Sequence, residues 1–242
     1  MIKMFTEVNT PKMDVKNVPR IEDFLIPTLK TSRVFYFPLV KVSPTLMPVW
    51  QQKVKRGMDI VIAFLAIVIL IPVYIITAIG VKISSKGPIL FKQQRIGLHG
   101  KPFEMIKFRT MFVNAEKNGP QLSSKADPRI TFFGKFLRKV RLDETPQLFT
   151  VLAGTMSLVG PRPERQFYID QIVEKIPHYL VLLKVKPGLT SWGQIKYGYA
   201  ENINQMVERF KFDMNYMENM SILTDIKVLV HTIFVVLQAS GR

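Results

Sequence analysis

The longest apolar segment of the chain is Ile60–Val81, which reads IVIAFLAIVILIPVYIITAIGV and contains no charged residue. A continuous helix of this length would measure about 33 Å, enough to cross the hydrocarbon core of a bilayer. Pro72 interrupts the segment, and lysines and arginines flank it on both sides, which favours both ends staying in the cytoplasm. The pattern predicts a re-entrant helix that breaks at Pro72; a kinked membrane-spanning helix is the alternative.

Other apolar positions recur at helical spacing, and they predict shorter helices. The segment Ile203–Met217 has an apolar stripe from Met206 to Met214 that is typical of a protein core. Ser221 is placed to cap the helix that follows it. The final apolar stretch, Ile226–Leu237, is about 18 Å long as a helix, so it predicts an interfacial or buried helix and not a span. The other predicted helices are Thr131–Val140, Pro146–Leu152, Phe167–Leu183 and Ile203–Met217.

Alternating apolar and polar residues within Ile89–Met111, on either side of a Leu-His-Gly-Lys turn, predict a β-hairpin. Residues 1–52 contain six prolines and little periodicity, which predicts an extended or partly disordered arm with a short strand at Val34–Phe37. Together the patterns predict an α+β fold that is mainly α. We expect the arm at 1–52 and, at 53–242, a compact monotopic membrane domain with the re-entrant helical hairpin and interfacial amphipathic helices.

Composition narrows the class of protein. The hydrophobic fraction of 48% is close to the globular average, so the chain is not a polytopic membrane protein. The absence of cysteine excludes thiolate zinc sites, disulfides and a cysteine nucleophile. Of the net charge of +16, residues 53–141 contribute +13. A basic block beside an apolar segment indicates anionic lipid headgroups or phosphate substrates. Nucleic acid is the alternative, but no nucleic-acid-binding motif is recognisable.

The candidate chemistry lies between Arg138 and Glu164, where Asp143 and Glu144 follow a cluster of basic residues. Carboxylates beside cations stay ionised at neutral pH, and an ionised aspartate can bind a metal or act as a nucleophile. Read without its neighbours, such a pair is more often a solvated helix start or a partner of the helix dipole. The basic residues and a Gly-Pro-Arg-Pro turn about twenty residues later favour a phosphate-binding site.

Several long motifs occur in a fixed order that resembles the bacterial sugar transferase family. These proteins are monotopic polyprenyl-phosphate hexose-1-phosphate transferases that begin exopolysaccharide, O-antigen and glycan assembly. The resemblance covers about residues 53–240. Its motifs are KRGMD at Lys55–Asp59, GPILFKQQRIG at Gly87–Gly97, KFRTM at Lys107–Met111, the stretch Asp127–Leu148, MSLVGPRPE at Met156–Glu164, VKPGLTSWGQI at Val185–Ile195 and the stretch Phe212–Leu229.

The resemblance implies a reaction in which sugar-1-phosphate moves from a UDP-sugar to undecaprenyl phosphate with release of UMP. Asp143 would be the nucleophile that forms an aspartyl-phosphosugar intermediate. Glu144 would assist with the metal or with the lipid phosphate. Mg²⁺ would be the cofactor, held by Asp143 and Glu144 together with substrate oxygens, in keeping with its preference for a carboxylate or two.

Both substrates are anionic, so an attacking carboxylate needs cations nearby to offset repulsion. Lys55 and Arg56 would pair with phosphates at the headgroup level of the membrane. The candidate substrate-binding arginines are Arg138, Arg141 and Arg162, followed by Arg109, Arg129 and Arg165.

The resemblance also implies a location and partners. We expect the cytoplasmic face of the bacterial inner membrane, contact with inner-membrane lipids and downstream glycosyltransferases, and no nucleic acid; the resemblance allows a homodimer. One rival hypothesis keeps the fold as a non-catalytic membrane-anchored scaffold. A second is a membrane-tethered nucleic-acid binder, which predicts steeply salt-dependent affinity for DNA or RNA.

Overall fold

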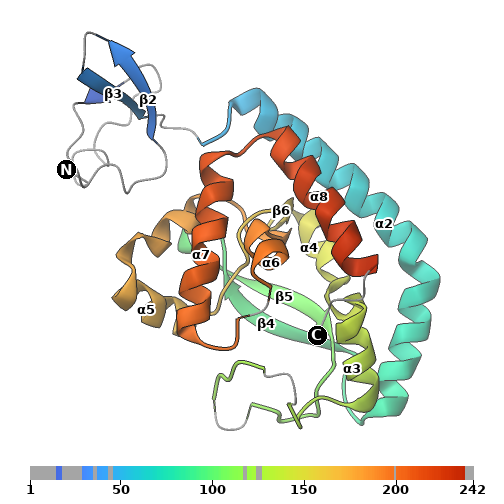
Figure 1. Cartoon of the computed structure of the whole chain (residues 1–242). Coiled ribbons are helices and arrows are strands. Elements are labelled where there is room, and N and C mark those ends of the chain that lie inside the picture. The colour runs from blue at the N-terminus through green and yellow to red at the C-terminus, as the bar shows by residue number, and fades with distance from the viewer. Residues whose placement is uncertain are drawn as a thin grey trace.

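The structure, a computed structural model, describes residues 15–17, 29–34, 37–42, 46–116, 119–123, 127–198 and 200–237, with the backbone alone before residue 46. The described residues are mainly helical with three small sheets, which confirms the α+β class (Figure 1).

Three short strands lie within the predicted arm: β1 (Val15–Asn17), β2 (Leu29–Val34) and β3 (Phe37–Val42). They form an antiparallel sheet in the order β1-β3-β2. The predicted strand at Val34–Phe37 is wrong, because Val34 ends β2, Phe37 begins β3 and the two residues pair with each other. The rest of the arm lies outside the described residues, and the boundary at residue 53 stays a prediction.

The apolar segment forms part of one long helix, α2 (Val49–Ser84), which continues through Pro72, so the predicted break of the helix at Pro72 is wrong. Figure 1 shows this helix as continuous and bent, along one side of the molecule. Its buried residues are few and lie one turn apart in two pairs, Asp59 with Ala63 and Thr77 with Val81. The helix contacts the rest of the chain along one face, where Ala66, Ile67 and Leu70 also pack against the main core and Tyr74 donates to Thr145 O at 3.1 Å, while most of its other apolar side chains face outward.

The predicted hairpin is confirmed by strands β4 (Leu90–Ile96) and β5 (Pro102–Phe108), which pair antiparallel across a short 3₁₀ turn, η2 (Leu98–Gly100). Side chains alternate between the two faces of a strand, so Phe91, Gln93 and Arg95 share one face of β4. The sheet register places Lys107 opposite Phe91. This face forms the floor of the candidate site described below.

Most predicted helices are confirmed, with shifts of a few residues at their ends. The predicted helix Phe167–Leu183 is wrong in its second half, where a 3₁₀ segment replaces it. Pro177 has no N–H and disfavours helical backbone at Ile176, whose φ of −139° ends the helix. The helical segments are α3 (Phe132–Lys139), η3 (Leu142–Glu144), α4 (Gln147–Ala153), α5 (Gln166–Lys175), η4 (Pro177–Lys184), α6 (Trp192–Lys196), α7 (Ile203–Glu218) and α8 (Ile222–Leu237).

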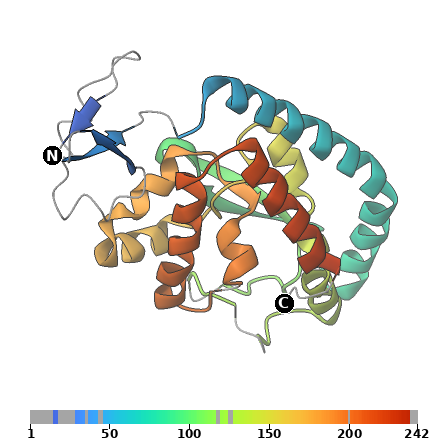
Figure 2. The same cartoon turned by 45° about the horizontal axis from the view of Figure 1, so that its top comes forward.

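The main core lies between α4, α5, α7, η4 and a small parallel sheet of β6 (Ser157–Val159) and β7 (Gly188–Thr190). Met206, Phe210 and Met214 are buried in it, which confirms the predicted core stripe of α7. Figures 1 and 2 show α8 beside α2 on the same side of the domain. A second cluster of Val81, Phe108 and Leu137 joins the end of α2 to β5 and α3.

Candidate active site

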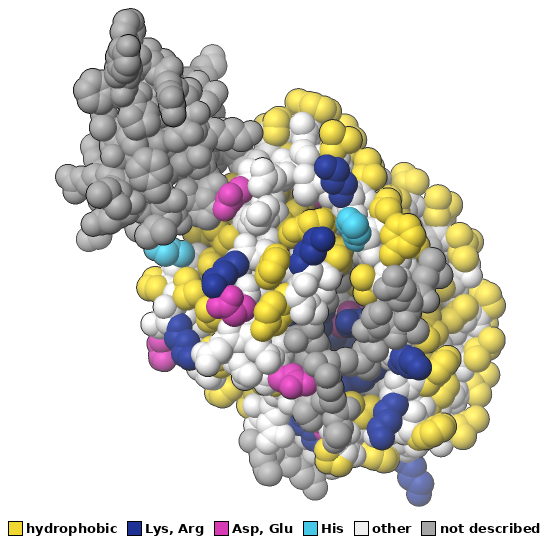
Figure 3. Space-filling model, viewed as in Figure 1, with side chains coloured by type: hydrophobic (Ala, Val, Ile, Leu, Met, Phe, Trp, Pro, Cys, Tyr) yellow, Lys and Arg dark blue, Asp and Glu magenta, His cyan; other side chains and the backbone are white. Residues whose placement is uncertain are grey.

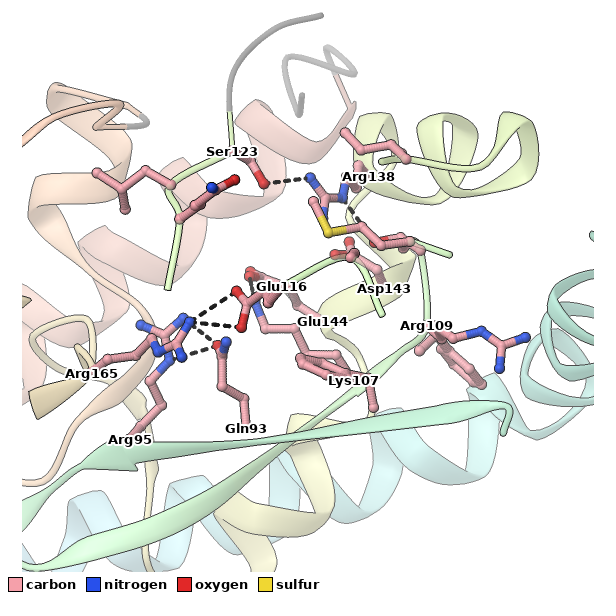
Figure 4. A pocket seen from close by; sticks show the side chains of 18 of the residues that line it. Gln93, Arg95, Lys107, Arg109, Glu116, Ser123, Arg138, Asp143, Glu144 and Arg165 are labelled. Carbon is pink, nitrogen blue, oxygen red and sulfur yellow. Dashed lines mark hydrogen bonds and ion pairs between the residues drawn. The ribbon is translucent and has the colours of Figure 1, made fainter. Parts of the chain in front are cut away.

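A cavity of about 730 Å³ opens over the hairpin face, bounded by α3, η3 and the segments around residues 112–123 and 162–168 (Figure 4). Cations outnumber carboxylates among the described residues that line it, so the cavity suits a ligand with several negative charges. The lining cations are Arg95, Lys107, Arg109, Lys135, Arg138, Lys139, Arg141, Arg162, Arg165 and Arg209; the lining carboxylates are Glu116, Asp143, Glu144 and Glu164.

A tight turn after α3 presents the two adjacent carboxylates to the cavity. Arg141 adopts a left-handed conformation with φ of 61°, which is uncommon for a residue other than glycine, and the chain then enters the 3₁₀ turn η3. With three residues per turn, neighbouring side chains diverge by about 120°. Asp143 and Glu144 therefore have different surroundings, although both are buried. The alternative of a solvated pair at a helix start is wrong.

Cations hold Glu144 in place. Its Oε1 accepts hydrogen bonds from Lys107 Nζ at 2.7 Å and Arg162 Nη2 at 2.9 Å, and Arg141 Nη1 lies 3.8 Å from its Oε2. Burial acts to raise the pKa of Glu144, but the charges of Arg162, Lys107 and Arg141 outweigh it and hold the pKa well below the ordinary value. Glu144 is therefore ionised at neutral pH and organises the site through its ion pairs.

Asp143 has a different environment, because its Oδ1 is buried and accepts no hydrogen bond from the described residues. Burial, and then the neighbouring charge of Glu144, raise the pKa of Asp143 to about 6, against the opposing effect of Lys107 and Arg138. The sequence predicted that nearby cations keep this carboxylate ionised; they do so at pH 7, but with a narrower margin than expected. Asp143 is thus the carboxylate with an oxygen still available to a ligand.

The three arginines given first place by the sequence, Arg138, Arg141 and Arg162, all line the cavity with the carboxylates. Arg138 donates through Nε to Thr110 Oγ1 at 2.9 Å and through Nη1 to Ser123 Oγ at 3.1 Å. Both acceptors are neutral hydroxyls, so the positive charge of Arg138 is not neutralised by these contacts. Figure 4 shows Arg138 above Asp143, on the side of the cavity opposite the hairpin.

Arg129 is not among the lining residues of the cavity. Its guanidinium binds Asp127 in a two-point contact, with Nε 2.8 Å from Oδ1 and Nη2 2.6 Å from Oδ2. The hydrogen bond from Arg129 lowers the pKa of Asp127. Arg129 also donates to Gln121 and so braces the loop beside the cavity. These contacts place the Arg129 guanidinium on the loop beside the cavity.

Lys55 and Arg56 also lie away from the cavity, although the resemblance implied that they face lipid phosphates. Lys55 Nζ donates to Val159 O at 2.9 Å and pairs with Asp225 of α8. Arg56 donates to the carbonyl oxygens of Val151 and Leu152, at the end of α4, at 2.7 and 2.8 Å. These side chains fasten the first part of α2 to the domain.

The sequence analysis missed several residues of the site. Lys107 bridges the hairpin to Glu144, and Glu164 pairs with Arg95, at 3.0 Å, and with Arg209. Glu116 was also missed; it pairs at 2.9 Å across the cavity edge with Arg165, which the sequence had named (Figure 4). The sequence signal that could have identified Arg95 is its spacing from Phe91 and Gln93, which places the three on one face of the strand. No sequence signal marked Arg209, because it lies within a core helix.

The residues present fit one magnesium ion as an accessory to a phosphate ligand. Among the described residues, no group of three or more histidines, aspartates or glutamates could hold a metal by itself. Mg²⁺ is commonly bound by one or two carboxylates, with substrate oxygens and water completing its shell. The unpaired Oδ1 of Asp143 provides such a ligand, whereas Oε1 of Glu144 already accepts from two cations.

Comparison with known proteins identifies the family. The model of the family described as "Bacterial sugar transferase" matches residues 50–239, so the chain belongs to this family. It is 40% identical over 78% of its length to a UDP-N-acetylgalactosamine-undecaprenyl-phosphate N-acetylgalactosaminephosphotransferase of Aeromonas hydrophila, 44% of which is covered. It is 37% identical over 90% of its length to a UDP-glucose:undecaprenyl-phosphate glucose-1-phosphate transferase of Escherichia coli, 47% of which is covered. The chain thus spans about half the length of these relatives.

Proposed function

We propose that this protein is a membrane-bound phosphotransferase that moves sugar-1-phosphate from a UDP-sugar to undecaprenyl phosphate. The observation that carries the proposal is the unpaired, buried Oδ1 of Asp143 in a strongly cationic cavity, beside a glutamate that is already neutralised. The names of the relatives supply the substrate classes, with N-acetylgalactosamine and glucose donors both represented.

In the proposed reaction, an oxygen of Asp143 attacks the phosphorus that carries the sugar. The bond from this phosphorus to the bridging oxygen breaks, and UMP leaves with the electron pair. An oxygen of undecaprenyl phosphate then attacks the same phosphorus, the bond to Asp143 breaks, and undecaprenyl-diphospho-sugar forms with the carboxylate regenerated. Such a covalent intermediate divides one difficult transfer into two easier steps.

The cations have separate roles in this scheme. Arg138 lies beside Asp143 in Figure 4 and donates to the neutral hydroxyls of Thr110 and Ser123, so it can neutralise negative charge on the attacked phosphate. Lys107 and Arg162 hold Glu144 and thereby fix the turn that carries Asp143. A magnesium ion bound by Asp143, with Glu144 near it, would supply further neutralisation of the diphosphate.

The outer surface supports membrane attachment. Of the described helices, α2 alone is long and apolar enough to cross a membrane, and its most apolar 18-residue window has a mean hydropathy of 3.0. Figure 3 shows hydrophobic side chains along the edge where α2 runs. Neighbouring helices α3, α4 and α8 add exposed apolar residues on their own surfaces. These are Phe132, Phe136, Phe149, Leu223, Ile233 and Phe234.

We further propose that α2 enters and leaves the membrane on one side, the cytoplasmic face of the inner membrane. Its first part is fastened by Lys55 and Asp59, and its last part by Val81 in the cluster with Phe108 and Leu137. Both ends therefore contact one compact domain, and a straight crossing would have to separate them across the bilayer. The outward-facing apolar side chains of this helix, which is bent in Figure 1, are left to enter the lipid.

Cysteine labelling tests this topology, and the chain contains no native cysteine to interfere. The variants Lys53→Cys and Lys86→Cys lie at the two ends of the apolar segment. We expect a membrane-impermeant maleimide to label both in inside-out vesicles and neither in right-side-out vesicles. Labelling of the two positions from opposite sides would show that α2 spans the membrane and would refute the re-entrant topology.

The reaction itself is tested by UMP release from a panel of UDP-sugars with undecaprenyl phosphate and Mg²⁺. We expect turnover with at least one donor, and a fall in rate as the pH decreases through about 6. The sign follows from Asp143, whose attacking form is the carboxylate and whose pKa burial raises to about 6. No turnover across the panel in folded, membrane-bound protein would favour the scaffold hypothesis. A rate independent of pH between 5 and 7.5 would contradict the role given to Asp143.

A further inference from the structure

Three cations are spaced along the hairpin on the cavity floor, and they extend to both sides of the carboxylate pair. Arg95 lies near the turn of the hairpin, Lys107 lies further along on β5, and Arg109 follows two residues later. The N–H of Arg109 donates to Ile89 O at 2.9 Å, so the strand pairing continues to this point. Residues two apart in a strand share a face and are about 6.6 Å apart. Figure 4 shows Arg95 on one side of Glu144 and Arg109 on the other, directed toward α2.

Arg109 is a buried cation with unused hydrogen-bond donors. Its side chain is 6% exposed, and its Nη2 donates to Ser85 O at 2.6 Å and to Ser85 Oγ at 3.0 Å. Its Nε and Nη1 donate to no acceptor among the described residues. No ion pair joins it to a described carboxylate, in contrast to Arg95, Lys107 and Arg162. A buried charge without a counter-charge is costly, so this position is suited to an anion supplied from outside the chain.

The backbone is shaped to admit this guanidinium. Gly87 follows the end of α2 with φ of +129°, a conformation that favours glycine. A Cβ at Gly87 would lie 2.4 Å from Arg109 Nη1 and 2.7 Å from a methyl group of Val113. Glycine therefore leaves the space that the Arg109 side chain fills at the mouth of the cavity.

The surroundings of Arg109 are apolar, unlike those of Arg95. Arg95 has Glu164, Gln93 and the backbone of Pro163 as hydrogen-bond partners. Besides Lys107 and Thr110, five hydrophobic lining residues lie near Arg109 in the chain or on the facing strand, and three of them are about half-exposed. They are Pro88, Phe91, Phe108, Phe112 and Val113. This end of the cavity lies beside the last turns of α2, where Ile79 and Ile83 are also exposed. The ligand that matches it has a phosphate joined to a hydrocarbon chain.

We propose that the Arg109 end of the cavity binds the phosphate of the acceptor lipid, and that the polyprenyl chain leaves over the apolar residues toward α2. The diphosphate of the donor then lies on the Arg95 and Arg165 side of Asp143. This inference rests on the proposed function and assigns one substrate to each end of the same cavity. Nε and Nη1 of Arg109 have no acceptor among the described residues, and a planar guanidinium can bind a phosphate through two N–H groups at once, which lysine cannot reproduce.

The first experiment measures binding of undecaprenyl phosphate without donor, in the Asp143→Asn background, where no covalent intermediate forms. We expect Arg109→Gln to weaken binding about 10- to 100-fold, as for loss of hydrogen bonds to a charged group. Lys92→Gln is the matched control: it removes one positive charge from the same hairpin, but Lys92 is exposed and pairs with Glu104. We expect it to change binding less than twofold. Equal binding by the Arg109→Gln and parent proteins, with both folded, would overturn the inference.

Two probes separate a lipid phosphate from other ligands. Undecaprenol, which lacks the phosphate, is expected to bind the parent and Arg109→Gln proteins equally weakly. Inorganic phosphate is expected to compete poorly with undecaprenyl phosphate. Competition by inorganic phosphate at the same concentration as the lipid would show a general anion site and would overturn the assignment. If Arg109→Gln does not fold, because Arg109 also caps α2, Arg109→Lys replaces it; unchanged lipid binding by that variant would count against the inference.

Steady-state kinetics separates this inference from the proposed function. Arg109→Gln is expected to raise KM for undecaprenyl phosphate about tenfold or more, with KM for the UDP-sugar within twofold of the parent value. A rise in KM for the donor alone would overturn the assignment while leaving the proposed function intact. If the parent protein released no UMP from any donor but still bound undecaprenyl phosphate in an Arg109-dependent manner, the proposed function would fail and the binding site would remain.

Discussion

Asp143→Asn is expected to reduce UMP release by about 10⁴-fold or more, the order found when a nucleophile is removed from an enzyme. Asparagine keeps the size of the side chain and can occupy the same turn, but its amide is not a nucleophile toward phosphorus. Turnover is measured with the best donor of the UDP-sugar panel at saturating undecaprenyl phosphate. If activity is retained by the folded variant, Asp143 does not carry the reaction and the scaffold hypothesis gains support.

The same substitution is expected to increase the stability of the protein, although it decreases the activity. The pKa of Asp143 is about 6 in the folded protein, above its ordinary value of 3.8. The folded state therefore binds more protons between these values, and stability falls as the pH rises from about 4 to 6. Asparagine carries no charge, so at pH 7.5 the variant is expected to be more stable by at most about 3 kcal/mol. Thermal unfolding at pH 5 and 7.5 measures the difference.

This pairing of effects excludes a trivial explanation for lost activity. A variant that is inactive because it is misfolded has a lower unfolding temperature, whereas Asp143→Asn is expected to unfold at an equal or higher temperature. Residues that hold an unfavourable charge for catalysis commonly show this exchange of stability for function. If the Asp143→Asn variant were inactive and strongly destabilised, the Asp143 side chain would have to make stabilising hydrogen bonds, contrary to what its unpaired Oδ1 indicates.

Glu144→Ala is expected to lower the free energy of unfolding by about 3–5 kcal/mol, because it leaves buried cations without their counter-charge. Lys107 and Arg162 both donate to Glu144 Oε1, and all three side chains are largely buried. Glu144→Gln keeps a hydrogen-bond acceptor and is expected to lose less. Glu104→Ala is the control, since Glu104 pairs with Lys92 on the surface, and its loss is expected to cost at most about 1 kcal/mol.

The pH dependence provides a second readout for Glu144. The folded-state pKa of Glu144 lies well below its ordinary value of 4.5, so its contribution to stability is present above that value and is lost as the pH falls through the folded pKa. The charge of Glu144 also raises the pKa of Asp143. Any residual activity of Glu144→Ala is therefore expected to persist to lower pH than that of the parent. If the residual activity of Glu144→Ala still fell at about pH 6, the charge of Glu144 would not affect the pKa of Asp143.

Sequence patterns sufficed where local rules decide the structure. The hairpin at 89–111 followed from alternation around a turn, and the stripe of α7 followed from helical spacing, because each depends on neighbours in the chain. The carboxylate pair was found through its basic flank, but the sequence alone did not separate the two residues. Their difference arises at the left-handed Arg141, after which Glu144 meets Lys107 and Arg162 while Asp143 Oδ1 has no hydrogen-bond donor among the described residues.

Where the expected roles of cations differ from their observed contacts, charge patterning did not show the partner of each cation. Lys55 and Arg56 flank an apolar segment and so resembled lipid-binding cations, but their partners, Val159 and Val151 among them, lie about 100 residues away. Arg129 was grouped with the other arginines because its neighbours are basic, yet its guanidinium donates hydrogen bonds to Asp127, two residues earlier. Charge patterning locates a cationic region, and only the folded structure shows which cations have their donors already occupied.

The apolar helix α2 is hydrogen-bonded to the core of the domain, so the domain needs this helix in order to fold. Asp59 accepts hydrogen bonds from Ser157 Oγ at 2.8 Å and from the N–H of Leu158 at 3.1 Å, both of which belong to the core strand β6. Removing α2 to obtain a water-soluble protein would strip these groups of their partner and open the core beside the loop that carries Arg162. Any soluble form of this protein would therefore need replacement contacts for β6, because α2 supplies part of the core as well as the apolar outer surface.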